Sequence, residues 1–214
     1  YKFSQSLKTR LEKTSIDIRY HTEVTPELVK ELAPDVVMIA TGATPIIPKI
    51  PGIDGSNVFP AAKVEDMKMD DIGENVVILG GGLVGCETAI HLGHHGKKVT
   101  IVEMRSEAAA DCNCFHKTAV QMELDKYVTV LTDTKAERIT DEGLFGMDKD
   151  NQPVFVAADM VICAAGMRSD NTLEMALADM DMDDDVEVYT IGDAVKPNKV
   201  TQAVFDGYYR AKYL

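Results

Sequence analysis

The chain has 214 residues, of which 45% are hydrophobic and 27% charged, a composition that is typical of a folded globular protein and excludes wholesale disorder. Asp and Glu number 35 against 22 Lys and Arg, and the net charge of −13 predicts neither nucleic acid nor an anionic membrane as a partner. No uninterrupted apolar run approaches the roughly 18 residues of a membrane-spanning helix.

The N-terminal part of the chain predicts two helices with a strand between them. Residues 3–13 carry an apolar side chain at every fourth position, which favours an amphipathic helix, and the alternation at 16–20 favours a short strand. Thr25 and Pro26 suit the N-cap and the first position of a second helix, which Pro34 ends.

Two stretches then predict how the chain is divided. The apolar run at 36–40 predicts a strand that is buried on both faces of a parallel sheet. The segment 44–60 is rich in Pro and Gly, which predicts a connection between two domains.

The remainder of the chain predicts an α/β fold with Rossmann-like parallel sheets and a three-stranded antiparallel meander. Strands and helices alternate at 76–79, 83–93, 98–102, 115–126 and 128–131, an order that calls for a parallel sheet. Residues 135–164 predict the meander and the strand that follows it. A strand at 186–191 and a helix from about residue 200 come last.

The strongest functional motif is a glycine-rich turn between the predicted strand 76–79 and the predicted helix 83–93. It consists of Gly80, Gly81, Gly82, Leu83, Val84 and Gly85. In a G-x-G-x-x-G turn of this kind the first glycine allows a tight turn, the second lets the backbone approach a pyrophosphate, and the third lets helix and strand pack closely. The free N–H groups at the start of the helix attract phosphates. The motif predicts a dinucleotide site, and the alternative is a turn with only a packing role.

Glu103 ends the next predicted strand, about 20 residues after the glycine turn, where this kind of fold places the acid that binds the ribose 2′-hydroxyl. A carboxylate at that position repels a 2′-phosphate, so the sequence favours NADH over NADPH. Arg105 could instead pair with a 2′-phosphate and keeps the second coenzyme open.

Three further small-residue turns follow predicted strands, at the strand ends where open α/β sheets bind their ligands. They are Ala40-Thr41-Gly42, Gly166 and Gly192-Asp193. Taken with the glycine turn, this set resembles the motifs of the two-dinucleotide-binding-domain flavoproteins, the pyridine nucleotide oxidoreductase superfamily. The resemblance spans nearly the whole chain, through the segments Val36–Pro48, Val76–Glu103, Asp159–Asn171 and Val188–Arg210.

Within that superfamily the chain is most similar to the C-terminal region of NADH:flavin oxidoreductases of the 2,4-dienoyl-CoA reductase and 2-enoate reductase type. In those enzymes an old-yellow-enzyme barrel accompanies this pair of domains. A short connection between Asn171 and Gly192 and the little chain after Arg210 favour this type. No cysteine pair is spaced C-x-x-C or C-x-x-x-x-C, so dithiol–disulfide exchange is not expected.

The resemblance implies an NAD(H)-binding domain at 61–168 and an FAD-binding domain built from 1–60 and 169–214. It implies that the glycine turn holds the NADH pyrophosphate, that Glu103 binds the adenosine ribose, and that Gly166 lies beside the nicotinamide half. The FAD site would include Ala40, Thr41, Gly42, Gly192, Asp193, Val200 and Thr201. In that site Asp193 would accept hydrogen bonds from the ribityl hydroxyls, and the helix start at Val200 would face the flavin pyrimidine.

The chain departs from the family pattern in lacking the first flavin G-x-G-x-x-G and the barrel with its FMN and 4Fe-4S cluster. The FAD site is therefore expected to be incomplete, and the chain to be an excised portion that needs its own barrel and flavin segment as partners and is inactive alone. In the full enzyme a hydride would pass from NADH to FAD, and electrons would continue through the cluster to FMN. The alternative is a non-catalytic module that binds or senses NAD(H), which a flavin fingerprint in the upstream coding sequence would exclude. The final substrate is not predicted, since it belongs to the barrel.

Several other side chains have two interpretations. Glu87 could lie near the nicotinamide or be a buried acid that accepts local N–H groups. Glu87, His91 and His95 share a helix face and could hold a metal, but a solvent-facing role is favoured and no metal is predicted.

The four cysteines have no regular framework, which is typical of a reducing compartment, so we expect a cytoplasmic protein. Cys112 and Cys114 are expected in a solvent-facing loop, and Cys86 and Cys163 in the core.

Overall fold

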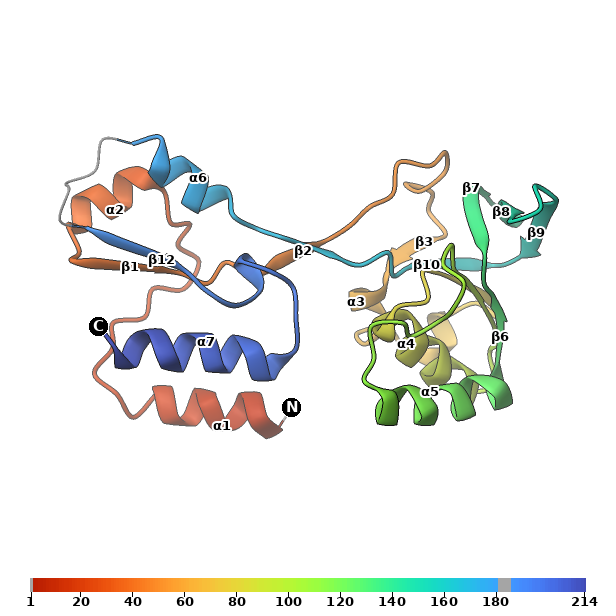
Figure 1. Cartoon of the computed structure of the whole chain (residues 1–214), viewed down its shortest axis with the longest axis horizontal. Coiled ribbons are helices and arrows are strands. Elements are labelled where there is room, and N and C mark those ends of the chain that lie inside the picture. Colours follow the sequence, from red (N-terminus) through yellow and green to blue (C-terminus); the bar gives the residue numbers. More distant parts are fainter. Residues whose placement is uncertain (1, 181–185) are drawn as a thin grey trace. The chain divides into compact units, whose positions relative to one another are not determined.

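The computed structural model describes residues 2–180 and 186–214 (Figure 1). By their contacts the residues form two compact units. One comprises Tyr1–Ala40 with Asn171–Ile191, and the other comprises Thr41–Asp170 with Gly192–Leu214.

The larger unit is built on a parallel sheet, in which five strands of the described chain take the order β3-β10-β4-β5-β6. These strands are β3 (Val58–Pro60), β4 (Asn75–Leu79), β5 (Lys98–Val102), β6 (Val128–Leu131) and β10 (Met160–Cys163). Helices α3 (Ala61–Val64), α4 (Leu83–His94) and α5 (Cys114–Tyr127) follow β3, β4 and β5 along the chain. Each helix connects parallel strands, as right-handed crossover units do. The predicted α/β fold class is confirmed.

The two faces of the sheet are covered by different elements, and β4 shows why its sequence is apolar throughout. Val76 and Ile78 pack into a core with α3, α4 and α5. Val77 and Leu79 point to the opposite face and pack against the meander. Because side chains alternate along a strand, a strand covered on both faces needs an apolar residue at every position.

The predicted meander is also confirmed. It consists of β7 (Thr134–Thr140), β8 (Gly143–Asp148) and β9 (Pro153–Ala157), which pair antiparallel in sequence order. Ile139 of β7 and Leu144 of β8 are buried against the large sheet, so the meander covers the face opposite the helices.

Short elements complete the larger unit. β2 (Ala43–Pro45) pairs antiparallel with β11 (Met167–Ser169), and the 3-10 turns are η1 (Met69–Asp71) and η2 (Gly192–Ala194). The segment 44–60 is more than a connection, because it also contributes β3 to the sheet.

The smaller unit contains α1 (Lys2–Leu11), α2 (Pro26–Leu32), β1 (Val36–Ile39), α6 (Thr172–Ala178) and β12 (Glu187–Thr190). As predicted, Thr25 caps α2, since its hydroxyl accepts the Leu28 N–H at 3.3 Å. Strands β1 and β12 form a parallel pair, the whole of this unit's sheet within the described residues. Val29, Ile39 and Leu177 make a small core on it.

Two predictions for the smaller unit are wrong. Residues 16–20 form no strand: the described chain offers them no pairing strand, and Ile16 and Tyr20 are 59% and 70% exposed. Strand β1 is not buried on both faces, because Val36, Val37 and Met38 are only partly buried and Ile39 is its one fully buried residue in the described structure. The alternation at 16–20 and the apolar run at 36–40 therefore matched strand patterns without determining whether other elements pair with or cover these segments.

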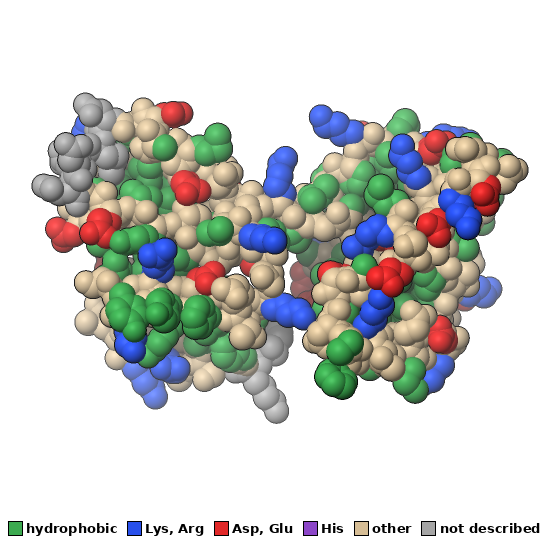
Figure 2. All heavy atoms as spheres, viewed as in Figure 1, with side chains coloured by type: hydrophobic (Ala, Val, Ile, Leu, Met, Phe, Trp, Pro, Cys, Tyr) green, Lys and Arg blue, Asp and Glu red, His purple; other side chains and the backbone are tan. Residues whose placement is uncertain are grey.

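Helix α7 (Val200–Lys212) presents a large apolar face to solvent, visible as a green patch in Figure 2. The rings of Phe205 and Tyr209 stack along it with their centroids 5.3 Å apart, and the ring of Tyr213, the C-cap residue, lies tilted against Tyr209 at 4.8 Å. No helix of the described chain has both the length and the apolar character needed to cross a membrane.

Gly85 offers a test of how closely α4 packs on the end of β4. A Cβ at this position would lie 2.0 Å from the Gly80 carbonyl oxygen, so Gly85→Ala should lower the free energy of unfolding by about 1–3 kcal/mol. Gly82→Ala is the matched control, since its Cβ would meet no atom closer than 3.9 Å and should change stability by less than about 0.5 kcal/mol. Urea denaturation measures both. Equal stability of the two variants would contradict the packing described.

Candidate functional site

The glycine turn lies where the sequence predicts it, between the end of β4 and the start of α4. Gly80 has a φ of +108°, a conformation that L side chains rarely adopt, and a Cβ there would lie 2.5 Å from the Ala164 carbonyl oxygen. Gly82 is the N-cap of α4 and has no side chain to satisfy the free N–H groups of the first turn. Leu83 and Val84 follow in that turn, and Val84 is exposed.

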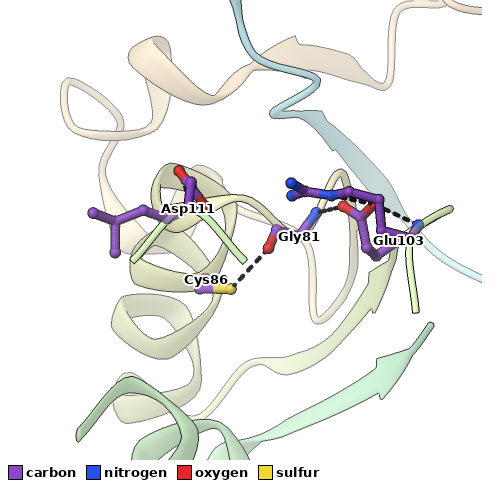
Figure 3. A network of polar contacts seen from close by, with 6 residues as sticks. Gly81, Cys86, Glu103 and Asp111 are labelled. Atoms are coloured by element: carbon purple, nitrogen blue, oxygen red, sulfur yellow. Dashed lines mark hydrogen bonds and ion pairs between the residues drawn. The ribbon is translucent and has the colours of Figure 1, made fainter. Parts of the chain in front are cut away.

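The peptide groups of Gly81 are held by hydrogen bonds on both sides (Figure 3). Its N–H donates to Oε2 of Glu103 at 2.5 Å. Its carbonyl oxygen accepts the Ala109 N–H at 2.7 Å and the Cys86 thiol at 3.3 Å. The bonds with Glu103 and Ala109 therefore join the turn after β4 to the loop after β5, and the bond with Cys86 joins it to α4.

Glu103 is a buried acid whose side chain is 6% exposed. Besides the Gly81 N–H, its Oε1 accepts the backbone N–H of Arg105 at 2.7 Å and the Arg105 Nε at 3.2 Å. Three N–H donors offset the desolvation of the carboxylate. A carboxylate has about four acceptor positions, so roughly one remains for a ligand hydroxyl.

A pocket of about 510 Å³ opens at this edge of the sheet. The predicted site residues Gly80, Gly82, Glu103 and Gly166 line it. Gly166 has a φ of +101°, and its carbonyl oxygen accepts the Ile46 N–H at 2.9 Å, which fixes the turn after β10 beside the pocket.

Sequence reasoning missed other residues of the pocket lining. Pro48 and Ile50 come from the Pro-rich segment, Lys135 and Ala136 from β7, and Asp111 from the loop after β5. Pro48 ends the segment Val36–Pro48 of the resemblance, but nothing in that segment predicted a place beside the glycine turn, and the others belong to no recognisable motif. The fold alone brings these segments to the strand ends.

The residues expected in a flavin site lie in turns after strands and at the start of α7. Thr41 donates its hydroxyl to the Asp170 carbonyl oxygen at 2.5 Å, and Ala40 is exposed. Oδ1 of Asp193 accepts the Asn198 N–H at 3.1 Å. The two glycines of these turns, Gly42 and Gly192, have φ values of +80° and +60°, and the exposed Val200 and Thr201 begin α7. Their flavin roles remain predictions.

Glu87 is not the buried acid of the second interpretation, since its side chain is 55% exposed. It lies 3.8 Å from Nε2 of His116 and does not line the pocket. His91 and His95 contact each other, with ring centroids 4.6 Å apart. Among the described residues no cluster of three His, Cys, Asp or Glu side chains is arranged to hold a metal.

The cysteines are unpaired thiols in three different environments. Cys86 and Cys163 are buried as predicted, and burial raises the pKa of Cys86 to about 11 and also raises that of Cys163. Cys112 is only partly exposed, because it packs against the helix-side core. Cys114 is exposed, and it begins α5 rather than lying in the loop.

Comparisons with known proteins show the family to which the chain belongs. The profile of the family described as pyridine nucleotide-disulphide oxidoreductase matches residues 1–207. An NADH oxidase of Thermoanaerobacter brockii is 34% identical over 211 residues, which is 96% of this chain and 32% of the relative. A cinnamate reductase of Clostridium sporogenes is 32% identical over 206 residues, 94% of this chain and 30% of the relative.

Among solved structures, a 2-naphthoyl-CoA reductase in complex with 2-naphthoyl-CoA matches with a TM-score of 0.81 and 31% identity, over 97% of this chain and 32% of that one. The chain thus spans about a third of the length of each of these relatives. Because the family profile matches nearly the whole sequence, the chain belongs to the pyridine nucleotide-disulphide oxidoreductase family.

Proposed function

We propose that this chain is the NADH-binding, electron-input portion of an NADH:flavin oxidoreductase of the dienoyl-CoA and enoate reductase type. One observation carries the proposal: a helix start whose N-cap is a glycine without a side chain, a glycine turn and a buried acid meet at one pocket. Parallel α/β sheets bind dinucleotides at this edge, with the pyrophosphate on the helix N-terminus.

The residues of the pocket fit NADH. The pyrophosphate would approach the backbone of Gly80 and Gly82 and accept N–H groups of the first turn of α4. Glu103 has about one acceptor position left, which suits one hydroxyl of the adenosine ribose. A 2′-phosphate would bring a second anion beside this buried carboxylate, so NADH is favoured. Arg105 neutralises part of that repulsion, because its Nε lies 3.2 Å from Glu103.

The protein's part in the reaction is to bind and orient. When NADH is bound, it supplies a hydride for transfer to FAD. The turn at Gly166 would let the backbone run close to the nicotinamide half without a side chain in the way. We also propose that Glu87 lies near the nicotinamide, and this placement rests on the resemblance to the flavoprotein family alone.

The larger enzyme is proposed on three grounds. The chain spans about a third of the length of its relatives. These are named NADH oxidase, cinnamate reductase and 2-naphthoyl-CoA reductase. The parallel pair β1–β12 is smaller than a stable sheet usually is. The apolar face of α7 is the kind of surface that a further domain covers. We propose that a barrel with FMN and a 4Fe-4S cluster, together with a first flavin segment, completes the protein.

The division into an NAD(H) domain at 61–168 and an FAD domain from 1–60 and 169–214 belongs to the same proposal. Ala40, Thr41, Gly42, Gly192, Asp193, Val200 and Thr201 would contribute to the FAD site. The four unpaired thiols suit a reducing compartment, so a cytoplasmic location is proposed.

Glu103→Gln tests the coenzyme assignment. The substitution keeps the size of the side chain but removes the charge, so NADH should bind about fivefold more weakly through a loss of about 1 kcal/mol. The preference for NADH over NADPH should also fall, because the 2′-phosphate is no longer repelled. Titration calorimetry with both coenzymes gives the ratio of the NADH and NADPH dissociation constants. A general loss of folded protein affects both constants alike and leaves this ratio unchanged. Glu107→Gln, an equal charge change on the same loop, should leave the ratio unchanged. Tighter binding of NADPH than NADH by the unaltered chain would overturn the role of Glu103.

Flavin content tests the incomplete FAD site. The purified chain should lack a stoichiometric flavin absorption band, because the segment that would hold the FAD pyrophosphate is not in this sequence. Adding free FAD should likewise give no tight complex in equilibrium dialysis. A yellow protein with one bound flavin per chain would contradict the proposal that another segment completes the site.

Thiol reactivity tests whether cysteine chemistry plays a part. Iodoacetamide should label the exposed Cys114 first, while Cys86 should react only on unfolding, because burial keeps its thiol protonated at neutral pH. Mass spectrometry of timed samples gives the order. NADH affinity should be unchanged after Cys114 is labelled, and rapid labelling of Cys86 in the folded chain would argue against its buried position.

A further inference from the structure

The loop after β5 places a carboxylate at the helix start where the proposed pyrophosphate site lies. Oδ2 of Asp111 accepts the Leu83 N–H at 3.5 Å. A Cβ added to Gly82 would lie 3.9 and 4.0 Å from the two Asp111 oxygens. Asp111 and Glu103 lie on opposite sides of Gly81 in Figure 3. The two acids thus have different positions, one beside the Gly81 N–H and one beside the first turn of α4.

The position of Asp111 follows from a fixed turn. The Ala109 N–H donates to the Gly81 carbonyl oxygen at 2.7 Å, and the Cys112 N–H donates to the Ala109 carbonyl oxygen at 3.0 Å. Ala108 and Ala109 are buried in the helix-side core. The backbone on both sides of Asp111 is therefore held, through Ala109 to the glycine turn and through Cys112 to Ala109, while its own side chain is exposed. Exposed side chains change rotamer readily.

The free N–H groups at the start of a helix stabilise a bound anion, and two anions at one helix start compete for the same N–H groups. The free N–H groups and the helix dipole attract negative charge, which Asp111 supplies when the pocket is empty. A pyrophosphate brings its own charges to the same N–H groups, and like charges about 4 Å apart repel each other unless one of them moves.

We propose that Asp111 is an internal competitor of the coenzyme pyrophosphate, one that lowers the affinity of the pocket for phosphate-bearing ligands. This inference rests on the proposed function, because it requires that α4 receives the pyrophosphate. It assigns Asp111 a role opposite to that of Glu103: Glu103 selects a hydroxyl on the ribose, whereas Asp111 must leave the helix start before the phosphates can bind.

The test compares ligands that differ in their phosphates. NADH, ADP and adenosine are titrated into the unaltered chain, Asp111→Asn and Asp141→Asn, with adenosine measured at millimolar concentration by competition with NADH. Asp111→Asn should bind NADH and ADP about fivefold more tightly, the size of effect expected for a charge at a helix start. Adenosine affinity should be unchanged. Asp141 is exposed in the turn between β7 and β8, so Asp141→Asn is the control for net charge.

Each of the other results would overturn the inference about Asp111, and one of them would also overturn the proposed function. Weaker binding of ADP to Asp111→Asn would show that the carboxylate helps to hold the ligand, which overturns the proposal. Equal tightening for adenosine, or by Asp141→Asn, would also overturn it, since neither effect depends on the phosphates at this helix. If the unaltered chain binds NADH and Asp111→Asn leaves that affinity unchanged, this inference fails and the proposed function stands. If neither protein binds NADH or ADP, both fail.

Discussion

The structure of the pocket depends on the peptide groups of Gly81. The N–H of this residue donates to Glu103 and its carbonyl oxygen accepts from Ala109 and Cys86, so the turn after β4 and the loop after β5 hold each other in place. A buried peptide that loses such partners is destabilised by about 1–3 kcal/mol per group. The same bonds direct the side chain of Glu103 and the turn that carries Asp111, so the chemistry of the pocket and the stability of the loop are linked.

The sheet supplies the rigid base for this arrangement. Alternate residues of β4 pack on the helices and on the meander, and the strand is buried along nearly its whole length. A strand that is covered on both faces can contact a ligand only at its ends. The carboxyl end of β4 opens on the pocket. The meander therefore does more than cover the sheet, because Lys135 and Ala136 extend the pocket wall beyond the glycine turn.

Local sequence was a good guide wherever local interactions decide the structure. Thr25 predicted the start of α2 because its hydroxyl can cap only the N–H groups a few residues ahead. The glycines after β4 predicted a tight turn, because glycine readily adopts a positive φ such as the +108° of Gly80. Residues 16–20 show the limit: their alternation satisfied a strand pattern, but a strand exists only where another strand donates and accepts hydrogen bonds.

The sequence by itself determined the α/β class, the glycine turn after β4 and the acid at the end of β5, because each follows from spacing within one short stretch. Only the tertiary structure decided that Glu103 already holds three N–H donors, that Pro48 and Lys135 reach the same pocket, and that Asp111 lies at the start of α4. These facts join segments that are distant along the chain, and such pairings are decided by how the sheet, helices and meander pack rather than by any local pattern.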